Sequence, residues 1–132
     1  MTWCQKTSKY RFVGLDSQDI EFDELNEKKD EFFIIDVRSP GELEYQGHIP
    51  NAHNIPLSEL DEAMALDDEA FSEKYGFDKP KEEDTVVTLC QKGGRARKAR
   101  EVLVAAGFIT RVYGGSFEDW KANGGDVEFG KE

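Results

Sequence analysis

Three segments of the chain have the hydrophobic pattern of buried strands. Residues 32–37 form a nearly continuous apolar run, which is typical of a strand that is buried on both faces of a sheet. Pro40 and Gly41 follow this run and mark its end. A β-branched run covers residues 85–89, and a shorter one covers residues 110–113. We therefore predict strands over these three segments.

Segments with helical spacing of apolar residues alternate with the strands. The strongest one, over residues 95–106, has an apolar stripe and is followed by Gly107 as a cap. The other predicted helices cover residues 17–28, with Ser17 as the N-cap, 69–75 and 117–122. Such alternation indicates βαβ units. We expect one α/β domain with a mostly parallel central sheet and helices on both of its faces.

Composition and charge exclude several classes of partner. The chain has 132 residues, and 17 Lys and Arg against 28 Asp and Glu give a net charge of −11. This charge disfavours binding to nucleic acid, and no apolar run approaches the roughly 20 residues of a membrane span. The only two cysteines, Cys4 and Cys90, suit a reducing compartment. We expect a cytoplasmic protein; residues 1–15, which are basic and lack acids, keep a mitochondrial location as the alternative.

The segment that follows the strand 85–89 has the composition of a reactive site. Cys90 comes first, Gly93 and Gly94 follow, and the predicted helix begins at Arg95. Ligands of such sheets bind beyond the carboxyl ends of the strands. The two glycines allow a tight turn whose N–H groups point inward, and the helix start adds further N–H groups. These groups favour an ionised, nucleophilic thiolate at Cys90, although a buried and inert cysteine is the structural alternative.

Basic residues are concentrated in and after this loop. Residues 90–111 contain six Lys or Arg and one acid, which is a local charge of +5. Cations at a helix N-terminus oppose the helix dipole, so a functional reason is expected for Lys92 and Arg95. For Arg97 and Arg100, a solvated helix face is the favoured interpretation.

Several motifs together resemble the rhodanese domain family, and in particular its small single-domain thiosulfate sulfurtransferases. The resemblance extends from residue 16 to residue 125, with residues 1–15 as a flexible lead-in and 126–132 as a C-terminal tail. The matching motifs are Asp36-Val37-Arg38, Gly47-His48-Ile49-Pro50-Asn51-Ala52, Asn54-Ile55-Pro56-Leu57, the loop Cys90-Gln91-Lys92-Gly93-Gly94-Arg95, and Gly114-Gly115 followed by Trp120 and Gly124. Asn51 departs from the family, which usually has glycine there.

The resemblance implies a reaction. Cys90 would take a sulfane sulfur from thiosulfate or a persulfide donor and pass it to cyanide, glutathione, a thioredoxin-like protein or another thiol. Backbone N–H groups from Gln91, Lys92, Gly93, Gly94 and Arg95 would hold the developing negative charge, and the Lys92 and Arg95 side chains would bind the sulfonate. No metal or organic cofactor is implied. Without the second domain of tandem relatives, the pocket would be open or covered by a partner, in a monomer or weak homodimer.

Other polar residues are interpreted as structural. We expect Asp36 and Arg38 to tie the end of the first strand to neighbouring loops, with Glu42 as the ionic partner of Arg38. His48 and His53 lack a third metal ligand, so a role in stabilising turns is favoured. Trp120 is expected in the core. Cys4 could resolve a Cys90 persulfide. The acid-rich stretch 59–84 is interpreted as a solvated excursion of helix and loop, and docking of a basic acceptor protein is the alternative.

Two alternative functions remain open from the sequence. A cysteine phosphatase or arsenate reductase needs the pattern Cys-x5-Arg, whereas here Ala96 occupies the arginine position and only a register shift to Arg97 would supply one. A regulatory or docking module without catalysis is the other alternative, although such modules usually lack the loop cysteine that this chain has as Cys90.

Overall fold

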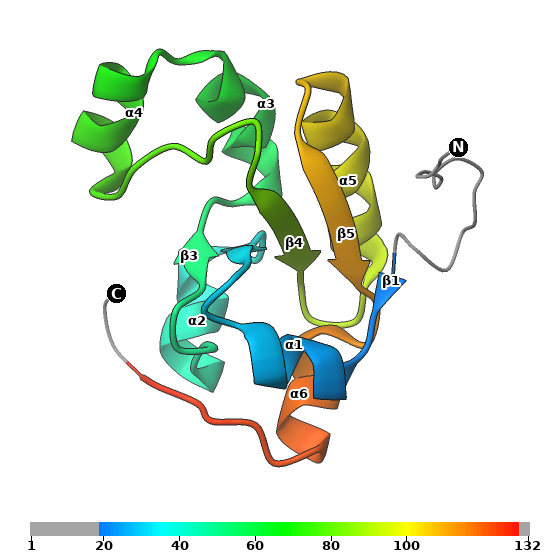
Figure 1. The fold of residues 1–132 in the computed structure, drawn as a ribbon. Helices are drawn as coiled ribbons and strands as arrows, with labels where there is room; N and C mark the ends of the chain where they lie inside the picture. The colour runs from blue at the N-terminus through cyan, green and yellow to red at the C-terminus, as the bar shows by residue number, and fades with distance from the viewer. Residues whose placement is uncertain (1–18, 130–132) are drawn as a thin grey trace, which may run out of the picture.

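The alternating strands and helices build one sheet of five strands whose paired neighbours are all parallel. The computed structural model describes residues 19–129, so the expected lead-in over residues 1–15, with Cys4, lies outside the described part (Figure 1). Its elements are β1 (Asp19–Ile20), α1 (Phe22–Lys28), β2 (Phe33–Asp36), α2 (Pro40–Gln46), β3 (His53–Asn54), α3 (Leu57–Ala65), α4 (Asp68–Tyr75), β4 (Thr85–Leu89), α5 (Gly94–Ala105), β5 (Ile109–Tyr113) and α6 (Ser116–Ala122). The expected α/β fold is confirmed.

Strand β4 lies in the middle of the sheet, where the strand order is β1-β5-β4-β2-β3. Val86 in β4 is opposite Phe33 in β2 and Thr110 in β5. Four of the five residues of β4 are buried, which agrees with its uninterrupted apolar sequence. Because the strands are parallel, the carboxyl ends of β2, β4 and β5 reach the same edge of the sheet.

Alternate side chains of the central strands enter two hydrophobic cores on opposite faces of the sheet. In β4, Val86 belongs to the core beneath α3, α4 and α5, whereas Val87 belongs to the core beneath α1 and α6. Leu103 of α5 and Trp120 of α6 are fully buried in these two cores respectively. Helices therefore cover both faces, and Trp120 is a core residue as predicted.

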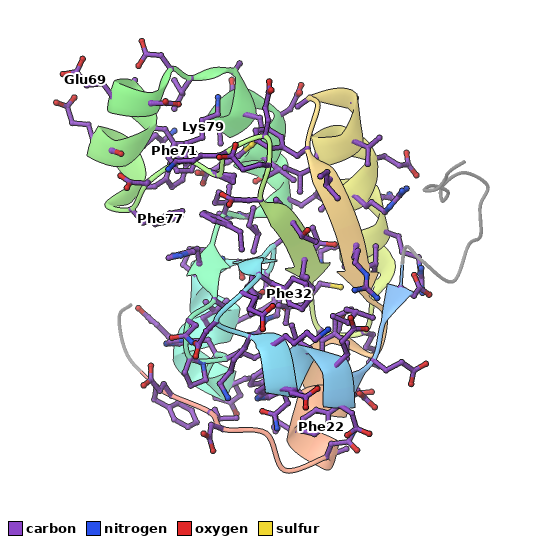
Figure 2. All side chains as sticks on the ribbon, in the orientation of Figure 1. Phe22, Phe32, Glu69, Phe71, Phe77 and Lys79 are labelled. Carbon is purple, nitrogen blue, oxygen red and sulfur yellow. The ribbon has the colours of Figure 1, made fainter. Side chains whose placement is uncertain are left out.

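An aromatic cluster extends the first core at the edge strand β3. Phe77 stacks on His53 with ring centroids 4.1 Å apart and meets Phe71 edge-on at 5.4 Å. Phe71 belongs to α4 and Phe77 follows this helix, whereas Phe22 begins α1 and lies by α6 (Figure 2). Burial lowers the pKa of His53, which favours its neutral form in this apolar setting.

Residues 19–129 contain no group of three or more side chains that could hold a metal ion.

The first predicted helix is shorter than expected. Instead of covering residues 17–28, it begins at Phe22 with Glu21 at the N-cap, so Ser17 is not the cap. Residues 19–20 instead form β1, which pairs with Val112 and Tyr113 of β5. Ile20 is buried through this pairing, a contact between distant parts of the chain that local helical spacing does not reveal.

Helix α2 was not predicted, because Pro40 and Gly41 were interpreted only as the end of a strand. Ser39 is the N-cap of this helix and Pro40 occupies its first turn, where a missing N–H has no cost. The Ser39 side chain accepts the Glu42 N–H at 3.4 Å, and the Glu42 carboxylate accepts the Ser39 N–H at 3.0 Å. This Ser-x-x-Glu capping box is the sequence signal that could have identified the helix.

The turn at Asn51 explains its departure from the family glycine. Asn51 has a φ of 76°, a left-handed conformation that asparagine tolerates better than most residues. We expect Asn51→Gly to change the free energy of unfolding by less than about 0.5 kcal/mol, and Asn51→Val to lower it by about 1–2 kcal/mol. Urea denaturation of both variants measures the difference, and equal stability of the two would contradict the backbone argument.

Residues beyond α6 pack back onto the domain. The Trp120 indole N–H donates to the Asp126 carbonyl at 2.7 Å, and His48 and Glu128 exchange two backbone hydrogen bonds of 2.8 Å each. Val127 packs against the core beneath α1 and α6. Residues 126–129 thus lie against the domain.

Among the described helices, none has the length and hydrophobicity needed to cross a bilayer.

Candidate active site

The predicted reactive loop lies at the edge of the sheet where three strands end. Cys90 directly follows β4, the central strand, and the loop leads into α5. On its two sides, β2 leads to Arg38 and β5 leads to Ser116. The position of β4 therefore places the cysteine between segments that are far away in the sequence. This edge is where ligands bind in open parallel sheets.

Two backbone N–H groups point at the Cys90 sulfur. The Gly93 N–H points to Sγ with an N–S distance of 2.9 Å, and the Ala96 N–H does so at 3.4 Å. Cys90 is only 1% exposed, so water does not replace these donors. Donors that converge on one sulfur stabilise negative charge there. Of the predicted donors in residues 91–95, Gly93 points its N–H at the sulfur, and Ala96 is a donor that the sequence reasoning did not include.

Ser116 supports the cysteine from the neighbouring strand end, and sequence reasoning missed it. Its Oγ accepts the Cys90 N–H at 3.1 Å, donates to the Tyr113 carbonyl at 2.9 Å, and lies 3.8 Å from the Cys90 sulfur. Ser116 is fully buried and has a φ of 59°, which is unusual for a residue other than glycine. A hydroxyl directly after the Gly-Gly pair that ends a predicted strand was the available signal.

Arg38 is completely buried beneath the loop. Its guanidinium pairs with Asp36 at 2.8 Å and donates to the Gly47 carbonyl at 3.0 Å and to Gln91 Oε1 at 3.2 Å. It also lies 4.1 Å above the centre of the Phe117 ring. As expected, Asp36 and Arg38 tie the end of β2 to neighbouring loops, and one of these loops contains the cysteine.

The expected pairing of Glu42 with Arg38 is wrong. Glu42 instead forms a two-pronged ion pair with Arg95, with N–O distances of 2.7 and 2.9 Å, because α2 places it against the first turn of α5. The hydrogen bonds from Arg95 are the main reason that the pKa of Glu42 falls to about 2. The pair stabilises the fold above the ordinary carboxyl pKa, and this contribution is lost as the pH falls towards about 2.

Besides Arg95, three of the cations that give residues 90–111 their positive charge have partners in the fold. Arg97 pairs with Asp19 at 3.3 Å, Arg111 pairs with Glu24 at 2.8 Å, and Arg100 donates to a backbone carbonyl. Lys92 is exposed and has no ion-pair partner among residues 19–129. The cationic patch is therefore smaller than the sequence suggested. Since Arg97 contacts Asp19, the structure does not favour the register shift that a phosphatase loop would need.

Gly93 has a backbone conformation and a close neighbour that leave no room for a side chain. Its φ is 117°, and a Cβ atom there would lie 2.6 Å from the Gly114 carbonyl oxygen. We expect Gly93→Ala to lower the free energy of unfolding by about 1–3 kcal/mol and to slow alkylation of Cys90, because its N–H would leave the sulfur. Gly94→Ala is the matched control, since a Cβ there meets no atom within 4 Å. Equal effects of the two substitutions on alkylation, measured by peptide mass spectrometry, would contradict the role of Gly93.

The fold and the loop define a class of protein: a parallel α/β domain with a buried cysteine in a tight loop between its central strand and a helix. The family model described as Rhodanese-like domain matches residues 20–123. The chain belongs to the rhodanese family, as its sequence motifs indicated.

Curated relatives carry sulfurtransferase or rhodanese names. A rhodanese domain-containing protein of Drosophila melanogaster is 40% identical over 67% of this chain and 80% of its own length. The putative mitochondrial thiosulfate sulfurtransferase of Schizosaccharomyces pombe is 43% identical over 66% of this chain, which matches 61% of that protein. The human thiosulfate:glutathione sulfurtransferase is 39% identical over 66% of this chain and 76% of its own length.

A solved structure has the same architecture. The human single-domain sulfurtransferase TSTD1 superimposes with a TM-score of 0.75 at 34% sequence identity, over 80% of this chain and 96% of that one. The arrangement of strands and helices is thus that of a single-domain member of the family.

Proposed function

We propose that this protein is a rhodanese-type sulfurtransferase that carries a sulfur atom on Cys90 as a persulfide. The observation that carries this proposal is the buried Cys90 sulfur with the Gly93 and Ala96 N–H groups 2.9 and 3.4 Å away. A sulfur anion needs such donors, both as the resting thiolate and as the charged persulfide. The names of the relatives point to the same chemistry.

The first half of the reaction loads the cysteine. The Cys90 thiolate attacks the outer sulfur of thiosulfate, a new S–S bond forms, and the S–S bond of thiosulfate breaks. Sulfite leaves with the electron pair of that bond, and the negative charge moves to the terminal sulfur of the persulfide. The N–H groups of residues 91–95 stabilise this charge, and Lys92 and Arg95 bind the sulfonate.

The second half returns the enzyme to its starting state. The thiolate of an acceptor attacks the terminal sulfur, forms an acceptor persulfide and releases the Cys90 thiolate. Cyanide reacts in the same way and leaves as thiocyanate. We propose glutathione or a thioredoxin-like protein as the natural acceptor; the name of the human relative supports glutathione. No metal or organic cofactor enters either step.

Location and assembly stay predictions. We propose that the protein acts in the cytoplasm or in mitochondria; some relatives are named mitochondrial. A monomer or weak homodimer is expected, and sedimentation velocity measures it.

Loading of Cys90 is the direct test. After treatment with thiosulfate, peptide mass spectrometry should find one additional sulfur atom on the Cys90 peptide, and sulfite should be released in equal amount. A panel of cyanide, glutathione, thioredoxin and sulfite then identifies the fastest acceptor. A Cys90 that gains no sulfur would support a regulatory module instead, and efficient hydrolysis of phosphate esters would support a phosphatase.

A further inference from the structure

The ion pair between Glu42 and Arg95 is held more firmly than an exposed pair usually is. Both carboxylate oxygens accept from the guanidinium, at 2.7 and 2.9 Å. One of these oxygens also accepts from the Ser39 backbone N–H at 3.0 Å and lies 3.1 Å from the Ser39 hydroxyl. Paired guanidinium and carboxylate groups of this geometry are fixed in direction as well as distance. The helix cap thus holds Glu42, and Glu42 holds Arg95.

This pair changes the net charge beside the reactive sulfur. The charged side chains that belong to the loop or are linked to it are three cations and two carboxylates, which gives a net charge of +1: Arg38, Lys92, Arg95, Asp36 and Glu42. Arg38 is offset by Asp36, and Arg95 is offset by Glu42. Without Glu42 the same set would have a charge of +2. Only Lys92 among them has no partner of opposite charge in the described part of the chain.

The charge of Arg95 acts on the site. Arg95 is the last residue of the loop motif, and it follows the two glycines in the first turn of α5. Its pKa is raised chiefly by the hydrogen bonds to Glu42, and the negative charge of a Cys90 thiolate raises it further. The next residue, Ala96, points its backbone N–H at the Cys90 sulfur at 3.4 Å, so Arg95 is one residue away from a group that contacts the sulfur. The charge of Arg95 therefore also acts on a ligand bound to the cysteine.

We infer that Glu42 is a specificity-determining residue, which offsets the charge of Arg95 so that the site favours sulfur compounds with one negative charge over those with two. This inference rests on the proposed function, because it concerns substrates of the same cysteine. Across several ångströms of a water-exposed site, one unit charge changes affinity by about threefold for each unit of charge on the ligand. Glu42 therefore weakens the binding of thiosulfate, which has two negative charges, more than the binding of a persulfide or thiosulfonate, which has one. The singly charged donors gain from Glu42 relative to thiosulfate.

The substitution Glu42→Gln isolates the charge of this residue. Glutamine also serves at the third position of a capping box, so the cap of α2 is retained. An amide oxygen still accepts a hydrogen bond from Arg95, but the negative charge is gone. Ser39→Ala is the matched control, because it weakens the same cap and leaves the ion pair in place.

The decisive measurement does not require sulfur transfer. Iodoacetate and iodoacetamide have similar size but charges of −1 and zero, so the ratio of their alkylation rates at Cys90 reports the local charge. Mass spectrometry of the Cys90 peptide separates this reaction from that of Cys4. We expect E42Q to raise the ratio of the iodoacetate rate to the iodoacetamide rate by about threefold. An unchanged or lower ratio, or an equal rise in S39A, would overturn the inference.

Steady-state kinetics then extend the result to donors. With thiosulfate as donor, E42Q should lower KM by about tenfold, and with the singly charged methanethiosulfonate by about threefold, with kcat within about twofold in both cases. Equal changes in KM for the two donors would contradict a charge effect. If the native enzyme transfers no sulfur from either donor, the proposed function fails, while the alkylation ratio still decides the role of Glu42.

Discussion

Replacement of Cys90 by serine is expected to lower the rate of thiocyanate formation from thiosulfate and cyanide by at least about 10³-fold. The serine oxygen is a poor nucleophile at neutral pH and forms no stable bond to a sulfane sulfur, so no covalent intermediate accumulates. The fold should persist, because the substituted side chain is small and the Gly93 and Ala96 N–H groups still have an acceptor nearby. We expect the free energy of unfolding to change by less than about 1.5 kcal/mol.

Cys4→Ser is the matched control for this experiment. Cys4 is the only other cysteine of the chain, and it lies outside the described residues. We expect the Cys4 variant to keep its rate of thiocyanate formation, measured in the same assay. A Cys90 variant that keeps more than a few per cent of the native rate would contradict the persulfide mechanism. Loss of activity in the Cys4 variant alone would make Cys4 the sulfur carrier.

Arg38→Met is expected to lower the free energy of unfolding by about 3–5 kcal/mol. Arg38 and Asp36 are both fully buried, and their ion pair has an N–O distance of 2.8 Å. Removal of the guanidinium leaves the Asp36 carboxylate buried without its counter-charge, and it also removes the donors to Gly47 and Gln91. A domain of this size is stable by only about 5–15 kcal/mol, so the loss should be visible in urea denaturation and in the melting temperature.

The double variant Asp36→Leu with Arg38→Met separates the buried charge from the other contacts. If the cost of Arg38→Met comes mainly from the unpaired carboxylate, the double variant should be more stable than the single one. A double variant that is less stable than Arg38→Met would show that packing and the bonds to Gly47 and Gln91 dominate. In either case we expect slower sulfur transfer in Arg38→Met, because Gln91 belongs to the reactive loop.

The segment from β4 to α5 was predictable because its signals are local. The β-branched run 85–89, the two glycines and the apolar stripe that follows each specify their own structure within a few residues. The predicted strand matches β4 in full, and the predicted helix over 95–106 differs from α5 by one residue at each end. Cys90 was placed correctly for the same reason, since it stands at the junction of these two elements.

Elements with weaker local signals were mispredicted or missed. Strand β1 has two residues and is specified by its pairing with β5, about 90 positions along the chain. Strand β3 is equally short and pairs with the end of β2. Most of helix α3 lies within the acid-rich stretch 59–84, which was interpreted as a solvated excursion of helix and loop, although Leu60, Ala63 and Met64 are buried in the core. Short strands gain their stability from neighbours, so their own sequences indicate little.

By itself, the sequence determined an α/β domain with Cys90 in a tight loop between a strand and a helix, because strand, turn and helix signals are encoded within a few consecutive residues. Its motifs also indicated the rhodanese family, to which the chain belongs. Only the tertiary structure decided which charges meet at that loop. Arg95 and Glu42 are 53 positions apart, as are Arg38 and Gln91, and Ser116 reaches Cys90 across 26 positions. Any of several acids could have neutralised any of several cations, and the packing of α2 against the start of α5 selected one combination. The charge that a substrate meets at Cys90 is therefore a property of the fold.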